Sequence, residues 1–453
     1  MQKIIFTILL AYSTVGYSQW WSELGGKSSF TANSQIYAIC RDKAGSLYAA
    51  GYFTNKVGKQ YVAKWDGTKW GALGGDTSTF FIRYDPIYTL CTDDAGNVYA
   101  AGHFINSKYK YFVAKWNGTN WAELGTGTNA LNAKYNILTI CSDAKGNIYA
   151  AGDIFDSSGV SAVAKWNGIN WYKLGSDSNA LNANSYIHSI CTDALGNVYA
   201  AGFFKNSNGK CYVAKWNGKQ WTELGKDSNA LNANKRVHSI FADALGNVYA
   251  AGEFTNSNGK CYVAKWNGIN WTELGNGNNA LNANSRILSI CMGAGNNIYA
   301  GGWFANSRGK GYVAKWNGIY WTELDTVINP LDADEAINSI CADAAGNVYA
   351  AGSFYSFKGY HYCAKYTSNT AAISDIYGDN EFKVYPNPVN NIVTLKYFTQ
   401  KKEVLTIYNV LGEVIYRDFW MPLQTQCDID VTSFSKGIYI INLGNLIKKV
   451  IVE

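Results

Sequence analysis

A unit of about 50 residues recurs along most of the chain with little variation. The first cysteine of a copy follows that of the previous copy after 51 residues once and after 50 residues five times, counting one phenylalanine as its replacement. These positions are Cys40, Cys91, Cys141, Cys191, Phe241, Cys291 and Cys341. A fixed period of this length with strand-like content is typical of propellers and solenoids, so it restricts the fold more than any other feature.

Each copy contains four segments that alternate or cluster apolar residues as short strands do. Asp193–Gly196 and Asn217-Gly218 are turn sequences that separate the first strand from the second and the third from the fourth. In the fourth copy the predicted strands are Ile187–Cys191, Asn197–Phe204, Tyr212–Trp216 and Trp221–Leu224. Four antiparallel strands per copy is the content of one propeller blade.

The ends of the repeat region predict how the ring closes. The chain begins with a fourth strand, Trp20–Gly25, while the seventh copy stops after its third strand at Tyr366. The leading strand therefore completes the last blade, and we predict an all-β, seven-bladed β-propeller with four antiparallel strands per blade. An open solenoid is the alternative, but it would need atypical polar caps, and the end copies resemble the middle ones.

The copies share the pattern Ala-x-Trp-Asn-Gly-x-x-Trp followed by Leu-Gly, seen at Ala214–Gly225. In this pattern the body of the chain resembles bacterial secreted β-propeller repeats. It departs from kelch repeats, since their Gly-Gly pair appears only at Gly301-Gly302, and it lacks the Gly-His and Trp-Asp pairs of WD repeats.

The N-terminus predicts export. Lys3 precedes the apolar run Ile4–Ala11, and small and polar residues follow, so we expect a signal peptide over residues 1–18. The apolar run is too short for a transmembrane helix, and we expect no transmembrane segment elsewhere. The propeller is expected over residues 19–366 and a linker over 367–381. A net charge of +6, scattered through every repeat, predicts no nucleic-acid partner.

The composition changes from residue 382 to 453. The motifs there are Tyr385-Pro386-Asn387-Pro388, a turn at Gly412, and a segment with Gly437 and Tyr439. With these motifs the region resembles the C-terminal sorting domain of type IX (Por) secretion cargo in the Bacteroidetes. The resemblance implies the outer-membrane translocon as a partner, then cleavage with release or attachment at the cell surface.

The pattern of this region by itself predicts a small Ig-like β-sandwich of six or seven strands, with the two prolines marking the start of the first strand. An accessory Ig-like domain without a sorting role is the alternative.

Three repeated residue types are expected to be structural. The six cysteines that recur once per copy lie on neighbouring sheets, too far apart for a disulfide, and we expect them to be small buried side chains. Whether any of the other four cysteines form disulfides stays open. The turn aspartates, such as Asp193, are expected to cap their turns rather than bind calcium. Lys215 and its equivalents are expected to pair with the Glu of the next strand or to cover a Trp.

Positions where the copies disagree are the candidates for a binding site. One column is the second residue of the inner strand, and the other follows the Ala-Ala-Gly of the second strand. If the first strand is innermost, both columns lie near one face of the propeller, where aromatic and acidic side chains can hold sugars or peptides. We therefore predict ligand-binding residues at Tyr37, Tyr52, Tyr88, His103, Asp153, His188, Phe203, His238, Glu253 and Trp303. The alternative is variable packing or rim positions.

His188 and His238 occupy equivalent places on adjacent blades, as two metal ligands would, but no acidic cluster accompanies them in the sequence. We predict no metal and no cofactor.

No catalytic motif appears in the chain, so the favoured function is a non-enzymatic, monomeric propeller that is secreted or attached to the cell surface and binds a glycan or protein through one face. A structural surface scaffold is one alternative, and self-association would favour it. A carbohydrate-active lyase or hydrolase is the other, and it would require Asp153 and Glu253 to converge on a pocket.

Overall fold

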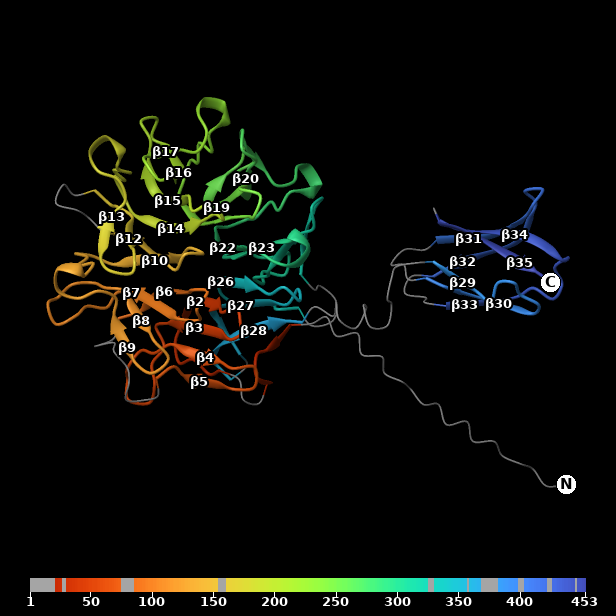
Figure 1. Ribbon diagram of the computed structural model, residues 1–453, viewed down its shortest axis with the longest axis horizontal. Helices are drawn as coiled ribbons and strands as arrows, with labels where there is room; N and C mark the ends of the chain where they lie inside the picture. The colour runs from red at the N-terminus through yellow and green to blue at the C-terminus, as the bar shows by residue number, and fades with distance from the viewer. Residues whose placement is uncertain are drawn as a thin grey trace, which may run out of the picture. The chain divides into compact units, whose positions relative to one another are not determined.

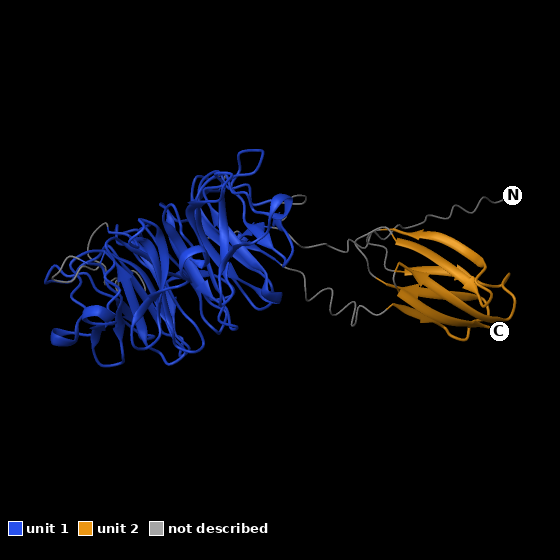
Figure 2. Cartoon of the chain, turned by 90° about the horizontal axis from the view of Figure 1, so that it is seen from above, with its two compact units in different colours: residues 1–369 blue, residues 370–453 orange. Residues whose placement is uncertain are grey.

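The structure is a computed structural model that describes residues 21–26, 30–74, 85–153, 160–324, 330–356, 358–367, 382–397, 403–421, 426–444 and 446–453. The expected signal peptide (residues 1–18), Trp20 and nearly all of the expected linker lie outside these ranges. The chain forms two compact units, residues 1–369 and residues 370–453, which Figure 2 colours separately.

Seven four-stranded antiparallel sheets make up the first unit, and Figure 1 shows them arranged around a centre. In each sheet the first strand of the repeat is innermost. The inner strands are β2 (Ile36–Arg41), β6 (Ile87–Thr92), β10 (Ile137–Ser142), β14 (Ile187–Thr192), β18 (Val237–Ala242), β22 (Ile287–Met292) and β26 (Ile337–Ala342). The second strands are β3 (Leu47–Gly51), β7 (Val98–Gly102), β11 (Ile148–Gly152), β15 (Val198–Lys205), β19 (Val248–Thr255), β23 (Ile298–Gly302) and β27 (Val348–Tyr355).

The outer half of each blade is formed by a short hairpin. The third strands are β4 (Ala63–Trp65), β8 (Ala114–Trp116), β12 (Ala164–Trp166), β16 (Cys211–Trp216), β20 (Cys261–Trp266), β24 (Ala314–Trp316) and β28 (His361–Tyr366). The fourth strands are β5 (Trp70–Ala72), β9 (Trp121–Glu123), β13 (Trp171–Lys173), β17 (Trp221–Glu223), β21 (Trp271–Glu273), β25 (Trp321–Glu323) and β1 (Trp21–Glu23). Blades 1 to 6 begin at β2, β6, β10, β14, β18 and β22, and blade 7 begins at β26.

The ring closes as the sequence predicts. β1 pairs with β28 in an antiparallel register that places Trp21 opposite Tyr366 and Glu23 opposite Ala364. Blade 7 is thus built from both ends of the repeat region, and the propeller has no unpaired terminal blade.

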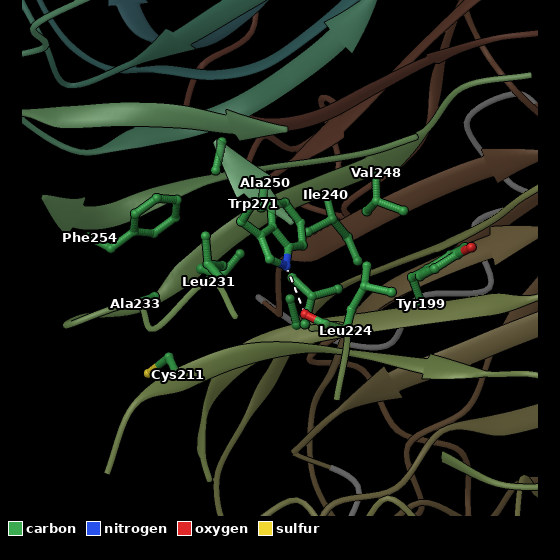
Figure 3. Packing of buried hydrophobic residues seen from close by; sticks show 14 residues of the cluster. Tyr199, Cys211, Leu224, Leu231, Ala233, Ile240, Val248, Ala250, Phe254 and Trp271 are labelled. Carbon is green, nitrogen blue, oxygen red and sulfur yellow. Dashed lines mark hydrogen bonds between the residues drawn. The ribbon is translucent and has the colours of Figure 1, made fainter. Parts of the chain in front are cut away.

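The core lies between consecutive blades. In the cluster of Figure 3, Tyr199 and Leu224 of blade 4 pack against Ile240, Val248 and Phe254 of blade 5. Clusters of equivalent composition lie between the other pairs of blades, which explains why these apolar positions vary so little.

Hydrogen bonds also join neighbouring blades at their outer and inner strands. The indole Nε1 of Trp271 donates to the Leu224 carbonyl at 2.8 Å, and that of Trp21 donates to the Leu324 carbonyl at 3.1 Å across the closure. Near the centre, the Ile240 amide donates to Ser189 Oγ at 3.0 Å. Ala38 occupies the equivalent position in blade 1 and has no hydroxyl to offer Leu90 of blade 2.

Short 3-10 turns occur in the segments between blades and in one turn of blade 6. They are η2 (Gly127–Asn129), η3 (Asp177–Asn179), η4 (Asp227–Asn229), η5 (Gly277–Asn279) and η6 (Ala294–Asn296). None of the helices in the described ranges has the length and apolar character needed to cross a bilayer.

The turn aspartates cap their turns, as predicted. Asp193 Oδ1 accepts from the Asn197 amide at 2.9 Å, while Oδ2 accepts from the Asn197 side chain at 2.7 Å and the Tyr199 hydroxyl at 2.9 Å. Both carboxylate oxygens therefore accept hydrogen bonds from the turn and from the second strand.

The expected pairing of the repeated Lys with the Glu of the next strand is wrong. Lys215 lies opposite Thr222, its Nζ sits 5.6 Å from the centre of the Tyr199 ring, and Glu223 is instead held by Asn206 at 3.1 Å. The reason is register, because the Glu pairs with the Ala before the Lys, whose side chain points to the opposite side of the sheet.

All ten cysteines are free thiols in the structure. Burial raises the thiol pKa of the cysteines that recur once per copy, such as Cys191. Phe241 fills the same position and stacks on Tyr249 with ring centres 4.6 Å apart.

The second unit is a β-sandwich of a three-stranded and a four-stranded sheet around a core that includes Trp420, Leu405 and Ile441. Its strands are β29 (Lys383–Tyr385), β30 (Ile392–Lys396), β31 (Glu403–Asn409), β32 (Val414–Trp420), β33 (Gln426–Asp430), β34 (Gly437–Leu443) and β35 (Leu446–Val452).

One expectation for this unit is wrong, since the prolines follow the first strand rather than begin it. β29 ends at Tyr385, and Pro386 has no amide hydrogen with which to continue the ladder. Asn387 then bonds to the last strand, donating to the Lys449 carbonyl at 2.9 Å and accepting from the Ile451 amide at 2.9 Å. The motif residues therefore connect the start of the domain to its C-terminal strand.

The two predicted motif glycines have positive φ values of 85° at Gly412 and 155° at Gly437, and the buried Tyr439 donates its hydroxyl to the Ser435 carbonyl at 2.7 Å.

Candidate functional site

A bulge in every inner strand positions the first variable column. In blade 4, Ile187 pairs with Gly202 but Ser189 pairs with Ala201, so His188 is the extra residue of the bulge. Bulges of this kind re-aim side chains, and the same register shift occurs in all seven blades.

A glycine positions the second column. A Cβ on Gly202 would lie 2.1 Å from the Tyr186 carbonyl oxygen, so only glycine permits this close approach. The next amide, of Phe203, donates to that carbonyl at 2.9 Å. The residue after the glycine is thereby fixed beside the bulge at one end of the blade.

The structure brings side chains of the two columns into contact in blades 5 and 7. His238 Nε2 lies 3.1 Å from Glu253 Oε1, and Asn338 donates to Ser353 Oγ at 3.2 Å. We call the end of the propeller where these columns meet the mouth face; the segments between blades and the loops between second and third strands lie there too. At the mouth face Tyr52 and Trp303 are each 43% exposed.

Members of the first column also contact each other around the centre. The rings of Tyr37 and Tyr88 have centres 5.8 Å apart, and those of His188 and His238 are 5.3 Å apart. Burial raises the pKa of both tyrosines, and neighbouring tyrosines raise it further. The centre of the propeller is therefore lined in part by polar aromatic side chains.

One acidic side chain, Glu253, lies beside the histidine pair. Glu253 accepts from His238, and Arg286 Nη1 lies 3.6 Å from the same Glu253 oxygen. His188 Nε2 is buried with no partner among the described residues, and burial, with His238 and Arg236 adding to it, lowers the pKa of His188 to about 4. Within the described ranges no set of three or more His, Cys, Asp or Glu side chains is arranged to hold a metal ion.

His103 belongs to a second polar group, on blade 2. Its Nδ1 lies 2.9 Å from Asp85 Oδ1, and its Nε2 lies 3.3 Å from the Tyr111 hydroxyl. Sequence comparison missed Asp85 and Tyr111. Both stand in further positions that vary between copies. Asp85 lies two residues before the inner strand β6, and Tyr111 lies three residues before the third strand β8.

Basic side chains over the aromatic residues were missed as well. The guanidinium of Arg236 lies 4.6 Å from the centre of the Phe203 ring, and that of Arg286 lies 5.3 Å from the centre of the Trp303 ring. Lys205 lies over Phe203 at 5.2 Å. Variation at the residue before the inner strand would have identified the arginines, since that column is Gln35, Pro86, Asn136, Tyr186, Arg236, Arg286 and Ala336.

Asp153 is the remaining acid of the predicted set. Its Oδ1 is buried without a partner among the described residues, and burial raises the pKa of this carboxyl.

The chain is similar in fold to several solved structures. PorZ, a surface component of the type IX secretion system of Porphyromonas gingivalis, matches with a TM-score of 0.54 at 12% identity, over 94% of this chain and 60% of its own. The extracellular domain of BT4673 from B. thetaiotaomicron matches with a TM-score of 0.48 at 14% identity, over 96% of this chain and 59% of its own. The Aleuria aurantia lectin with bound Fucalpha1-6GlcNAc matches with a TM-score of 0.41 at 14% identity, over 67% of this chain and 98% of its own. This chain thus spans about 60% of the length of PorZ.

The first unit has the fold of a β-propeller protein. Residues 383–453 match the family model of the secretion system C-terminal sorting domain, and they are a type IX sorting domain. This domain directs the chain to the outer-membrane surface or beyond it, and it implies contact with the type IX machinery. No curated protein matches the chain in sequence.

Proposed function

We propose that this protein is a non-enzymatic surface or secreted propeller that binds a glycan or a surface protein through the mouth face. The observation that carries the proposal is the mouth face itself, where aromatic side chains stand beside charged ones in the two varying columns. Tyr52 and Trp303 remain 43% exposed although both emerge from a rigid strand end. Rigid, half-exposed aromatic residues with polar neighbours are suited to stacking on sugars or anchoring a protein side chain.

Binding of the exported protein to arrays of glycans and of surface proteins tests the proposal. We expect at least one ligand class to bind, and Trp303→Ala or Tyr52→Ala to weaken binding by about tenfold, since each removes a stacking contact. Tyr320→Ala is the matched control, because Tyr320 is also 43% exposed but lies in the outer hairpin turn at the other end of the blade. Binding that is absent from a broad panel, or unaffected by both mouth substitutions, would contradict the proposal.

A carbohydrate-active enzyme is the second candidate, and Asp153 is the observation that favours it. A carboxyl with a raised pKa can act as a general acid. Release of reducing ends or unsaturated sugars from polysaccharides, abolished in Asp153→Asn, would replace the binding proposal with this one.

The oligomeric state of the exported protein distinguishes a structural scaffold from a monomeric binding protein. We expect the exported protein to be monomeric in sedimentation, and concentration-dependent self-association would favour the scaffold instead.

A further inference from the structure

A pocket opens on the mouth face along the seam between blades 5 and 6. Its volume is about 420 Å³, within the range of small-ligand sites. Blade 5 and the segment before it contribute Lys235, Glu253 and Thr255, and blade 6 with its preceding segment contributes Asn284, Arg286 and Trp303. We call this the seam pocket.

The seam pocket combines an apolar platform with hydrogen-bonding groups. Trp303 is 43% exposed, and the Arg286 guanidinium lies 5.3 Å from the centre of its ring. Amide, hydroxyl and charged side chains surround the indole. A sugar ring needs both kinds of contact, since its C–H faces are apolar while its hydroxyls both donate and accept.

Positive charge exceeds negative charge around this seam. Glu253, the acid of the pocket, is already engaged by His238 at 3.1 Å and by Arg286 at 3.6 Å. Lys235 lines the same pocket, and Arg236 stacks on Phe203 nearby; neither forms a salt bridge within the described ranges. Lys235 is therefore available to a ligand, and Arg286, whose Nη1 lies 3.6 Å from Glu253 and so beyond hydrogen-bond distance, keeps its donors for a ligand as well.

Comparison of the copies shows that the arginines are confined to two neighbouring seams, those before blades 5 and 6. Of the seven residues that directly precede the inner strands, only those of blades 5 and 6 are arginines. The position of Lys235 is occupied by Asp85, Tyr135 and Glu335 in blades 2, 3 and 7. Packing between blades is equivalent everywhere, so it does not require arginine at this column.

We propose that the seam pocket binds an acidic sugar unit, with the ring against Trp303 and the carboxylate or sulfate held by Arg286 and Lys235. This inference rests on the proposed function and names its ligand class. Guanidinium groups pair with carboxylate and sulfate oxygens through short, charge-assisted bonds, so a neutral sugar of the same shape lacks that contribution.

The test compares one sugar with and without its charge. Trigalacturonic acid and its methyl ester are titrated calorimetrically into the exported protein at low salt, and a sulfated tetrasaccharide and its desulfated form make up the second arm. We expect the charged form to bind about tenfold or more tightly in at least one arm, and added salt to reduce the difference. The arm that responds identifies carboxylate or sulfate as the recognised group.

Variants separate the two halves of the pocket. Arg286→Gln is expected to remove most of the preference for the charged form, while Trp303→Ala weakens both forms by about tenfold. Trp303→Phe serves if the alanine variant folds poorly, since the equivalent Phe203 is tolerated in blade 4. Lys145→Glu, an exposed change in the turn at the other end of blade 3, controls for net charge and is expected to leave the preference intact.

Equal affinity for charged and neutral forms in both arms would overturn the inference. An effect of Lys145→Glu as large as that of Arg286→Gln would also overturn it, because that result indicates general attraction to polyanions. If a neutral glycan or a protein binds in a Trp303-dependent way, the proposed function stands and only the acidic-sugar inference fails. If no glycan or surface protein binds, both fail.

Discussion

The buried environment of His188 changes the pKa of its side chain. It occupies a bulge position that is leucine at Leu138 and Leu288, yet it is an ionisable group with a buried Nε2. Burial, with His238 and Arg236 adding to it, lowers the pKa of His188 to about 4, so the folded protein holds this ring neutral at pH values where the unfolded chain protonates it.

The resulting prediction concerns stability against pH. Because the folded pKa lies below the unfolded value of about 6.5, the unfolded state binds more protons, and stability falls as pH drops from about 6.5 toward 4. The loss attributable to this group is on the order of 3 kcal/mol at most. His188→Leu is expected to flatten that part of the curve, measured by urea denaturation at pH 7 and pH 4.5. A variant with an unchanged slope would show that the histidine is not the group responsible.

The fourth strand of each blade is held to the previous blade through its tryptophan. Trp271 is buried and donates to Leu224 at 2.8 Å, as the equivalent Trp221 does to Leu174 at 3.0 Å. Trp266, the partner of Trp271 across the hairpin, lies 6.0 Å from it ring to ring and is only partly buried. The two tryptophans of one hairpin therefore have different roles.

Substituting each in turn measures that difference. Trp271→Phe leaves the Leu224 carbonyl without its donor and is expected to cost about 1–3 kcal/mol beyond the loss of apolar contact. Trp266→Phe makes the same change of side chain at a partly buried position without removing that hydrogen bond, and so it serves as the control. The free energies of unfolding from denaturant titration check this, and equal costs for the two variants would refute it.

At the scale of the whole molecule, stability depends on joining the two ends of the repeat region. The buried Trp21 is the residue of β1 that contacts both Tyr366 in β28 and Leu324 of blade 6. Without β1, blade 7 would keep three strands and expose an edge.

Removing residues 19–26 is therefore expected to destabilise the propeller by about 3–5 kcal/mol or more, the cost of deleting a large buried aromatic side chain. Restoring the strand after Tyr366, through the Asn-Gly-Lys-Gln turn found at 217–220, should recover the lost stability. Thermal unfolding of the three proteins is the measurement. A truncated chain as stable as the intact one would mean that closure by β1 is unimportant.

Most of the architecture could be predicted because every copy of the repeat contains the same strand and turn signals. Strands such as Ile187–Thr192 lie within one residue of their predicted limits, since alternation and turn residues act locally. The partners of Lys215 and Glu223 could not be predicted in the same way, because one residue of register decides which side of the sheet each side chain takes. The role of the prolines after Tyr385 was missed for a similar reason, as Asn387 bonds to a strand more than 60 residues away.

By itself, the sequence determined the number of blades, their four strands, the closing role of the first strand and the sorting domain, because repetition and short motifs are local properties. The tertiary structure alone decided which varying side chains meet. Glu253 of blade 5 reaches Arg286 of the next blade, whose guanidinium covers Trp303, through a bulge and a close glycine approach that no spacing in the chain reveals. The recognition that we propose for the mouth face depends on such contacts between blades, since the seam pocket takes residues from two blades.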